Sequence, residues 1–174
     1  MKTNFTLEPE IFDEGPVILV TFRHSGFLEV VFASPNIRQL TGYELDAILA
    51  HPHSYVELLH PDDLQNYLDE TIQAEKQQLI NFQRRPYRLK HQDGRYRWIR
   101  EVTSIRAEDK AKTSLFNGYL IDITEQFEAG MARKKAENEL RKHHDQLQAL
   151  VYEKTRDLIQ AKEDADRANQ AKSE

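Results

Sequence analysis

The chain has 174 residues, of which 39% are hydrophobic and 30% are charged, and its formal net charge is −5. This composition fits one modest domain with a solvated extension, and an acidic chain without a basic cluster argues against a nucleic-acid partner. The absence of cysteine excludes disulfides, thiolate catalysis, Cys-type zinc sites and thiol–flavin chemistry. No apolar run approaches the roughly 18 residues that a membrane span needs. We therefore expect a cytoplasmic fragment without membrane contact, whatever anchor a longer parent protein carries.

The first apolar segments predict a β-hairpin. Residues 17–23 and 27–33 are rich in Val, Ile, Leu and Phe, and His24-Ser25-Gly26 between them is a short turn. From residue 34 to about residue 60 the apolar pattern breaks into short helical pieces. The first half of the chain is therefore expected to begin with two strands and to continue as helices.

A longer helix is expected from Pro61 to about residue 79, because a proline suits the first turn and Asp62 and Asp63 lie near the positive end. Strands follow at about residues 82–91, 95–107 and 114–123, with a hairpin turn at Asp93-Gly94. Two strands, several helices and three strands predict an α+β domain. We expect a five-stranded antiparallel sheet with its helices gathered on one face.

The composition changes near the end of the last strand. All six prolines and five of the six glycines precede residue 120, and neither type occurs after Gly130. The sequence therefore predicts a flank or cap at 1–16, a folded domain at 17–124 and a helical tail at 125–174.

The tail carries a heptad pattern, because its seam residues step alternately by four and three over four heptads. The seam consists of Leu140, His144, Leu147, Val151, Lys154, Leu158, Ala161, Ala165 and Ala168. A lone helix has little against which to bury this stripe, so we expect a parallel homodimer in which Asp157 pairs with Lys162 of the other copy. A solvated single helix or a disordered linker is the alternative.

Five short motifs follow one another along the domain. They are Phe32-Ala33-Ser34-Pro35-Asn36-Ile37, Leu40-Thr41-Gly42-Tyr43, His60-Pro61-Asp62-Asp63, Asp93-Gly94-x-x-Arg97-Trp98 and Gly118-x-x-x-Asp122-Ile123-Thr124. In this order and spacing they resemble a PAS domain over about residues 10–124. The stretch from Ala161 to Glu174 resembles the lead-in to the phospho-accepting helix of a sensor histidine kinase. The resemblance implies the PAS fold followed by a signalling coiled coil.

PAS domains close a pocket between the inner sheet face and the inserted helices, and strand alternation predicts which side chains point into it. The candidates are Phe32, Leu40, Tyr87, Leu89, Ile99, Glu101, Thr103, Phe116 and Leu120. These residues either fill the core or line a site for an apolar or amphipathic small molecule. Glu101 is the polar anomaly, because a buried carboxylate needs a partner or a ligand. An edge position or a bulge is the alternative explanation for Glu101.

The resemblance also disfavours a flavin. His53 stands where flavin-binding light sensors of this family carry their reactive Cys. Leu89, Ile99 and Leu120 stand where those relatives carry amides that hold the flavin ring. A flavin would leave polar groups unpaired there, at about 1–3 kcal/mol each.

Haem and metal ions are disfavoured as well. Haem-binding PAS domains generally use a His on the long helix, and residues 61–79 contain none. His51, His53 and His60 have no nearby acid at clear ligand spacing, so surface or capping roles are expected for them. We expect no metal and no cofactor, with an unidentified small molecule left open.

The end of the last strand is the expected coupling point. The resemblance implies that Asp122 and Thr124 join the sheet to the helix, with Asp122 reaching Arg97 or Trp98 on the adjacent strand. Helix capping by Thr124 is a second role, and both can hold. Trp98 is expected on the outer sheet face, where a covering helix or a dimer partner would contact it.

The sequence favours the sensory module of a two-component histidine kinase that acts on a response regulator. The fragment itself is expected to catalyse nothing, because the motifs of the kinase core are absent. Three alternatives remain: phosphoryl transfer by the fragment, a structural dimerisation module with a filled core, and a PAS sensor for a cyclase output.

Overall fold

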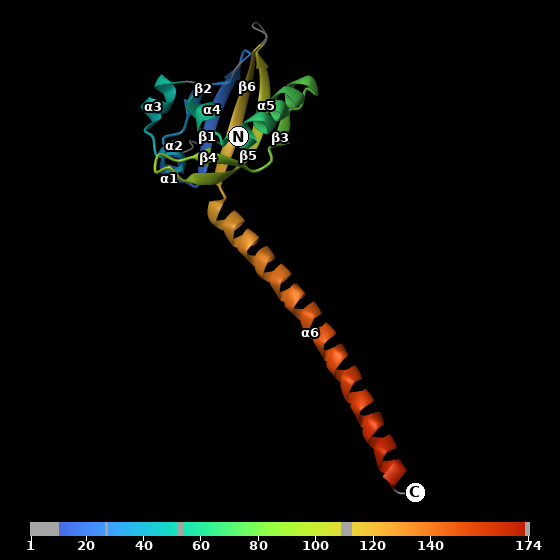
Figure 1. Cartoon of the computed structure of the whole chain (residues 1–174). Coiled ribbons are helices and arrows are strands. Elements are labelled where there is room, and N and C mark those ends of the chain that lie inside the picture. The colour runs from blue at the N-terminus through green and yellow to red at the C-terminus, as the bar shows by residue number, and fades with distance from the viewer. Residues whose placement is uncertain (1–10, 27, 52–53, 109–112, 173–174) are drawn as a thin grey trace, which may run out of the picture. The chain divides into compact units, whose positions relative to one another are not determined.

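The computed structural model describes residues 11–26, 28–51, 54–108 and 113–172 (Figure 1). Its helices are α1 (Ile11–Glu14), α2 (Ile37–Thr41), α3 (Leu45–Ala50), α4 (Ser54–Leu58), α5 (Pro61–Lys76) and α6 (Thr124–Lys172). Its strands are β1 (Val17–His24), β2 (Leu28–Ala33), β3 (Asn81–Gln83), β4 (Tyr87–Lys90), β5 (Tyr96–Glu108) and β6 (Thr113–Asp122).

All strand pairs are antiparallel, in the order β2-β1-β6-β5-β3, and β4 also pairs with β5. This arrangement confirms the α+β fold and the long C-terminal helix, but the sheet has six strands where the sequence predicted five. The expected strand at 82–91 is divided into β3 and β4, and Pro86 lies in the break. A proline has no N–H for the strand ladder, so pairing stops there.

The break also changes which side chains face inward. Phe82 packs against the core and Arg84 is buried, whereas after the break Tyr87 and Leu89 are the buried positions. The buried side chains are thus two residues apart before the break and three apart across it. A strand of strict period 2 running through Tyr87 and Leu89 would have placed Arg84 outside.

A bulge displaces one predicted pocket residue. Thr21 pairs with Phe32, but the next residue, Phe22, pairs with Val30, so Val31 is the extra residue of β2. Beyond this bulge Phe32 lies on the outer sheet face, 49% exposed. The expectation that Phe32 lines the pocket is therefore wrong.

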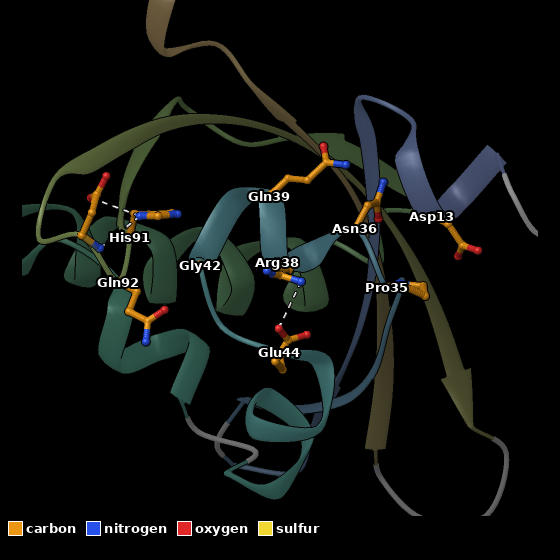
Figure 2. Close-up of a pocket in the computed structure, with 10 residues that line it drawn as sticks. Asp13, Pro35, Asn36, Arg38, Gln39, Gly42, Glu44, His91 and Gln92 are labelled. Atoms are coloured by element: carbon orange, nitrogen blue, oxygen red, sulfur yellow. Dashed lines mark hydrogen bonds and ion pairs between the residues drawn. The ribbon is translucent and has the colours of Figure 1, made fainter.

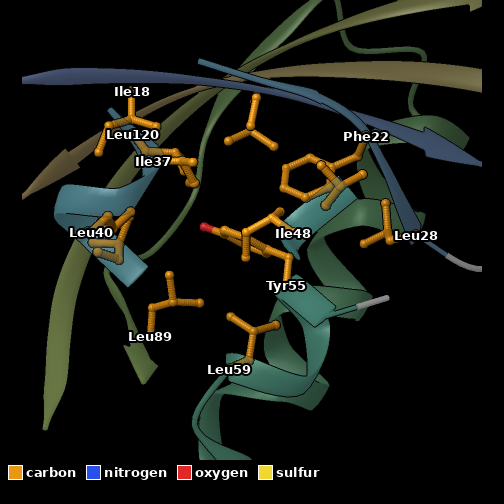
Figure 3. Close-up of a cluster of buried hydrophobic side chains, with 14 of the residues drawn as sticks. Ile18, Phe22, Leu28, Ile37, Leu40, Ile48, Tyr55, Leu59, Leu89 and Leu120 are labelled. Carbon is orange, nitrogen blue, oxygen red and sulfur yellow. The ribbon is translucent and has the colours of Figure 1, made fainter. Parts of the chain in front are cut away.

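The core lies between the sheet and the short helices (Figure 3). Alternate residues of β1 contribute Ile18, Val20 and Phe22, while the helical segments contribute residues such as Leu40 and Tyr55. Helix α5 begins at Pro61 as expected, but it ends at Lys76, three residues before the predicted end. Gln78 then adopts a left-handed backbone conformation with φ of 52°.

The chain divides into two compact units, residues 1–125 and 126–174. The second unit consists of α6, whose Leu140, Leu147 and Leu158 are 72%, 60% and 70% exposed. Among the described residues, no helix is both long and apolar enough to cross a lipid bilayer.

Two glycines allow a direct test of backbone packing. Gly42 follows α2 with φ of 78°, and a Cβ built on it would lie 2.8 Å from the Cβ of Gln92. Gly94 has a similar φ of 87°, but a Cβ there meets nothing within 4 Å. We predict that Gly94→Ala lowers the free energy of unfolding by about 1 kcal/mol, and that Gly42→Ala lowers it by at least about 2 kcal/mol. Urea denaturation measures both; equal losses would contradict the close approach of the α2 turn to the β4–β5 hairpin.

Candidate functional site

The inner sheet face brings together most of the predicted pocket residues. Eight of the nine candidates are buried with at most 3% exposure, namely Leu40, Tyr87, Leu89, Ile99, Glu101, Thr103, Phe116 and Leu120. Phe32 is the exception described above. The apolar members belong to one continuous core cluster. The structure buries these side chains together on the inner sheet face, with one polar group among them.

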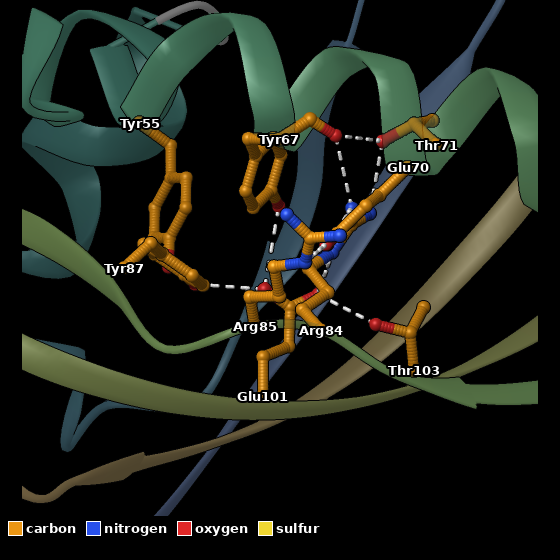
Figure 4. Close-up of polar contacts among 9 residues, drawn as sticks. All are labelled: Tyr55, Tyr67, Glu70, Thr71, Arg84, Arg85, Tyr87, Glu101 and Thr103. Atoms are coloured by element: carbon orange, nitrogen blue, oxygen red, sulfur yellow. Dashed lines mark hydrogen bonds and ion pairs between the residues drawn. The ribbon is translucent and has the colours of Figure 1, made fainter. Parts of the chain in front are cut away.

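Glu101 is the centre of that polar group (Figure 4). Its Oε1 accepts from Arg84 Nε at 3.0 Å and from the Thr103 hydroxyl at 2.6 Å. Its Oε2 accepts from the hydroxyl of Tyr87 at 2.7 Å and, more weakly, from that of Tyr67 at 3.4 Å. Four donors on one buried carboxylate replace the water that it has lost. Glu101 therefore has the partners that the sequence analysis required, and neither an edge position nor a bulge is needed to explain it.

Arg84 is held independently of Glu101. Its Nη1 donates to the Tyr67 carbonyl at 3.0 Å and its Nη2 donates to the Thr71 hydroxyl at 2.9 Å, both on α5. The guanidinium carbon lies 4.0 Å from the ring centroid of Tyr67 and 4.8 Å from that of Phe82. Both Arg84 and Glu101 have fully buried side chains. The ion pair thus joins α5 to the centre of the sheet.

Sequence reasoning missed Arg84 and Tyr67. Pro86 within an apparent strand was the available signal for Arg84, since a proline in a run marks a break at which alternation can fail. Tyr67 carries no comparable signal, because it lies within the long helix and outside the five motifs.

A chain of phenols continues from Glu101. The Tyr55 and Tyr87 hydroxyls lie 2.6 Å apart. The Tyr87 hydroxyl already donates its hydrogen bond to the Glu101 carboxylate, so in the contact with Tyr55 it accepts and the Tyr55 hydroxyl donates. Burial is the main reason that the pKa of each of Tyr55, Tyr67 and Tyr87 is raised above its usual value. All three phenols therefore remain protonated and able to donate at neutral pH.

Gly118 makes room for this carboxylate. It lies on β6 opposite Thr103, and a Cβ on it would approach Glu101 Oε1 to 3.2 Å. Any larger residue would push against the buried carboxylate, so a glycine is suited to this strand position although glycine weakens a strand.

A separate groove of about 820 Å³ opens on the surface (Figure 2). Asp13, Asn36 and Gln39 line it from the side of α1 and α2, and His91 and Gln92 line it from the β4–β5 hairpin. Its charged lining residues are three carboxylates and one guanidinium, namely Asp13, Glu44, Asp93 and Arg38. Arg38 lies 3.2 Å from Glu44, and Asp93 lies 3.1 Å from His91. The lining therefore carries more negative than positive charge.

Surface or capping roles were expected for His51, His53 and His60, and the expected absence of a metal ion stays a prediction. Among the described residues, no group of three or more His, Asp and Glu side chains could hold a metal ion. His51 follows α3, and His60 caps α5 by accepting from the Asp62 N–H at 3.2 Å. His53 lies outside the described residues.

The coupling residues meet at the end of β6. Asp122 Oδ1 accepts from the Thr124 N–H at 2.8 Å and from the Thr124 hydroxyl. The same Thr124 hydroxyl accepts from the Trp98 N–H at 2.8 Å, and the Ile123 N–H donates to the Trp98 carbonyl at 2.8 Å. Asp122 thus reaches β5 through Thr124. The structure joins three of the four coupling residues in one network.

Arg97, the fourth coupling residue, points to the β4–β5 turn, where its Nη2 lies 3.6 Å from Asp93. Trp98 is half-buried on the outer sheet face, with the Arg88 guanidinium 5.3 Å from its ring. The covering helix or dimer partner expected over Trp98 stays a prediction.

Comparison with known proteins identifies the family. Residues 30–120, just over half of the chain, match the family described as the PAS fold, and the chain belongs to it. A methyl sulfide methyltransferase-associated sensor of Methanosarcina acetivorans is 31% identical over 119 residues. The match covers 68% of this chain but only 12% of that sensor. The domain described above is a PAS sensor domain.

Two solved structures share the fold. A sensory box histidine kinase/response regulator from Burkholderia thailandensis is 20% identical with a TM-score of 0.57, over 76% of this chain and 96% of that one. The N-terminal domain of a diguanylate cyclase with a PAS/PAC sensor from Marinobacter aquaeolei is 19% identical with a TM-score of 0.52, over 64% of this chain and 98% of that one. At these identities the likeness establishes the fold alone. The expected absence of flavin and haem stays a prediction.

The buried pair yields a prediction for a double-mutant cycle. Arg84→Met and Glu101→Leu should each lower the free energy of unfolding by about 3–5 kcal/mol, because each leaves a buried charge without its partner. The double variant removes both charges, so its loss should be smaller than the sum by about 2–3 kcal/mol. Urea denaturation of all four proteins measures the coupling. Additive losses would show that the two charges do not depend on each other.

A second ion pair predicts a pH dependence. Asp63, at the start of α5, accepts from Arg88 Nε and Nη2 at 2.8 Å each and from the Arg88 N–H at 2.9 Å. Hydrogen bonds from the Arg88 side chain lower the pKa of Asp63. A carboxyl whose pKa is lower in the folded than in the unfolded chain stabilises the fold fully at pH values above its unfolded-state pKa of about 3.9. This stabilisation is lost as the pH falls through the folded-state pKa.

Asp63→Asn should therefore lower the free energy of unfolding by about 1–2 kcal/mol at pH 7, and its difference from the parent should shrink below about pH 4. The neighbouring Asp62 is the control, because its side chain is 75% exposed and lies 3.5 Å from Arg88. Asp62→Asn should have little effect. If the free energy of unfolding of Asp63→Asn differed from that of the parent by the same amount from pH 7 to pH 3, the lowered pKa of Asp63 would be contradicted. Urea titrations across this range provide the measurement.

Proposed function

We propose that the chain is the sensory and signal-transmitting module of a two-component histidine kinase. It relays a change in the PAS domain to a parallel coiled coil formed by α6. The observation that carries this proposal is the junction at Thr124, whose hydroxyl accepts from Trp98 on β5 while its N–H donates to Asp122 on β6. The first residue of α6 is therefore bonded to two strands of the sensor sheet. A change in the spacing of those strands alters the start of the helix.

Dimerisation of α6 is part of this proposal. Its apolar seam residues are exposed within one chain, and a second copy supplies the surface that would cover them. Lys154 and His144 interrupt the seam with polar side chains, which favour one register over shifted ones. In the cytoplasm the parent kinase would phosphorylate itself and act on a response regulator. This fragment would supply the regulation and no catalysis.

The kinase assignment is supported by the kinase-like sequence of residues 161–174 and by the sensory box kinase with the same fold. A cyclase output is the second candidate, since a diguanylate cyclase carries a PAS domain of this fold. A purely structural dimerisation module is favoured by one observation, the filling of the inner sheet face by the domain's own side chains. Incubation with labelled ATP tests the remaining alternative, in which this fragment itself transfers phosphate.

Two adjacent residues of α6 test the dimer. Leu158 lies on the proposed seam and Ile159 does not, although they are 70% and 55% exposed in the single chain. We predict that Leu158→Asp shifts the full chain from dimer to monomer in sedimentation equilibrium, because it places two charges at the seam. Ile159→Asp makes the same chemical change beside the seam and should leave the dimer intact. Equal behaviour of the two variants would contradict the heptad register.

A substitution at Asp122 tests the relay. Asp122→Ala removes the acceptor for the Thr124 N–H and hydroxyl, and it should lower the free energy of unfolding by only about 1 kcal/mol, as loss of a helix cap does. In a chain that includes the output domain, it should change the ratio of autophosphorylation with and without stimulus, because a lost contact shifts the balance between two junction geometries. Thr124→Val, which also removes the bond from Trp98, should change the ratio in the same direction. An unchanged ratio in both variants would refute the coupling role.

A further inference from the structure

The pairing of Glu101 with Arg84 has the chemistry of a bound ligand. The carboxylate receives four hydrogen bonds from four side chains, which are Arg84, Thr103, Tyr67 and Tyr87. A carboxylate in a binding site is recognised in the same way, by a fixed guanidinium and several neutral donors in a dry cavity. We call these four donors the carboxylate clamp.

The carboxylate clamp is held in place without help from Glu101. Two Arg84 hydrogen bonds to α5 and its contacts with the Tyr67 and Phe82 rings do not involve Glu101. Tyr87 keeps its contact with the Tyr55 hydroxyl at 2.6 Å. Gly118 brings no Cβ against Oε1, where one would come within 3.2 Å. A guanidinium held by other contacts is suited to binding an anion, because little ordering has to occur on binding.

We propose that the carboxylate clamp is a binding site for a small monocarboxylate, and that the native chain fills it with Glu101 as a tethered ligand. Because the tether holds the carboxylate at a high effective concentration, a free carboxylate does not displace it in the native protein. Removal of the Glu101 side chain converts the core into an open carboxylate site. The proposal is independent of which output domain follows and of dimerisation by α6, so its failure would leave the proposed relay untouched.

An access route to the clamp is present. A small cavity of about 80 Å³ lies between α5 and the break that separates β3 from β4. Tyr67 and Tyr87 of the clamp line it, together with Glu70 and Arg85. Glu70 lies 3.6 Å from Arg85 and 4.0 Å from Arg84 and is 26% exposed, so it stands at the outer edge of this cavity. We expect a molecule of the size of acetate to approach the clamp from this side when Glu101 is absent.

The clamp is connected to α6 through β5 and β6, because Glu101 lies on β5 beside β6. Glu101 pairs with Leu120 across β5 and β6, and Ile99 pairs with Asp122 two residues further along. The carboxylate therefore sits on the pair of strands that end at the Thr124 junction.

Acetate is the probe, because Glu101→Ala deletes a CH₂–COO⁻ group that acetate restores with one added hydrogen. We expect the melting temperature of the full-length Glu101→Ala variant to rise and saturate as sodium acetate is added. A tenfold shift in its folding equilibrium corresponds to a rise of about 3–6 °C for a chain of this size. Sodium chloride at equal ionic strength and neutral acetamide should not produce this rise. The parent protein should not respond to acetate.

Two further measurements separate binding from a general salt effect. The double variant Glu101→Ala/Arg84→Met lacks the guanidinium and should lose the acetate response. If Glu101→Ala is unfolded in chloride, circular dichroism should show it folding as acetate is added, since a ligand of the folded state drives folding. A response equal to that of chloride, a response retained without Arg84, or a variant that stays unfolded at all acetate concentrations would overturn the proposal.

Discussion

The buried ion pair of Arg84 and Glu101 is the constraint on which the rest of the domain depends. Two full charges lie in the centre of the core, where each alone would be strongly unfavourable. They are tolerated because Glu101 has four donors and Arg84 is bonded to α5 as well as to β5. The same contacts fix the position of α5 over the sheet. They are accompanied by Gly118 on β6, whose missing Cβ would come within 3.2 Å of Glu101, by the break between β3 and β4, and by the raised pKa values of Tyr67 and Tyr87.

The inward-facing residues of β4, β5 and β6 could be predicted from the sequence. Period-2 alternation placed Leu89, Ile99 and Leu120 inside correctly, because those strands run without interruption across their pairs. It failed at Phe32, where a bulge shifts the alternation by one residue, and it did not find Arg84, where Pro86 does the same. Bulges and breaks depend on partner strands that are distant in sequence, so a local pattern cannot reveal them. Glu101 was recognisable as an anomaly, but its partner was not.

At the Thr124 junction, too, local contacts could be predicted from the sequence and contacts between distant residues could not. Helix capping near Thr124 could be predicted from the residue types, since hydroxyl and carboxylate side chains favour helix starts. The bond from the Trp98 N–H to the Thr124 hydroxyl spans 26 residues of sequence and emerges only from the register of β5 and β6. The sensor sheet therefore ends in a network that is polar, close to the surface and small, whereas its centre is buried and charged. In the proposed relay, the start of α6 would change at this network while the buried centre keeps the fold.

The central claim, a dry and persistent ion pair inside the sensor core, is tested most directly by hydrogen exchange at the arginine Nε–H groups. Nitrogen-15 spectra of the full chain can compare Arg84, whose side chain is fully buried, with its neighbour Arg85, whose side chain is 82% exposed. We expect the Arg84 Nε–H to be protected until the domain unfolds globally, while that of Arg85 exchanges at the rate of a free side chain. Exchange of Arg84 as fast as that of Arg85 would show that water reaches the pair, and would contradict the account.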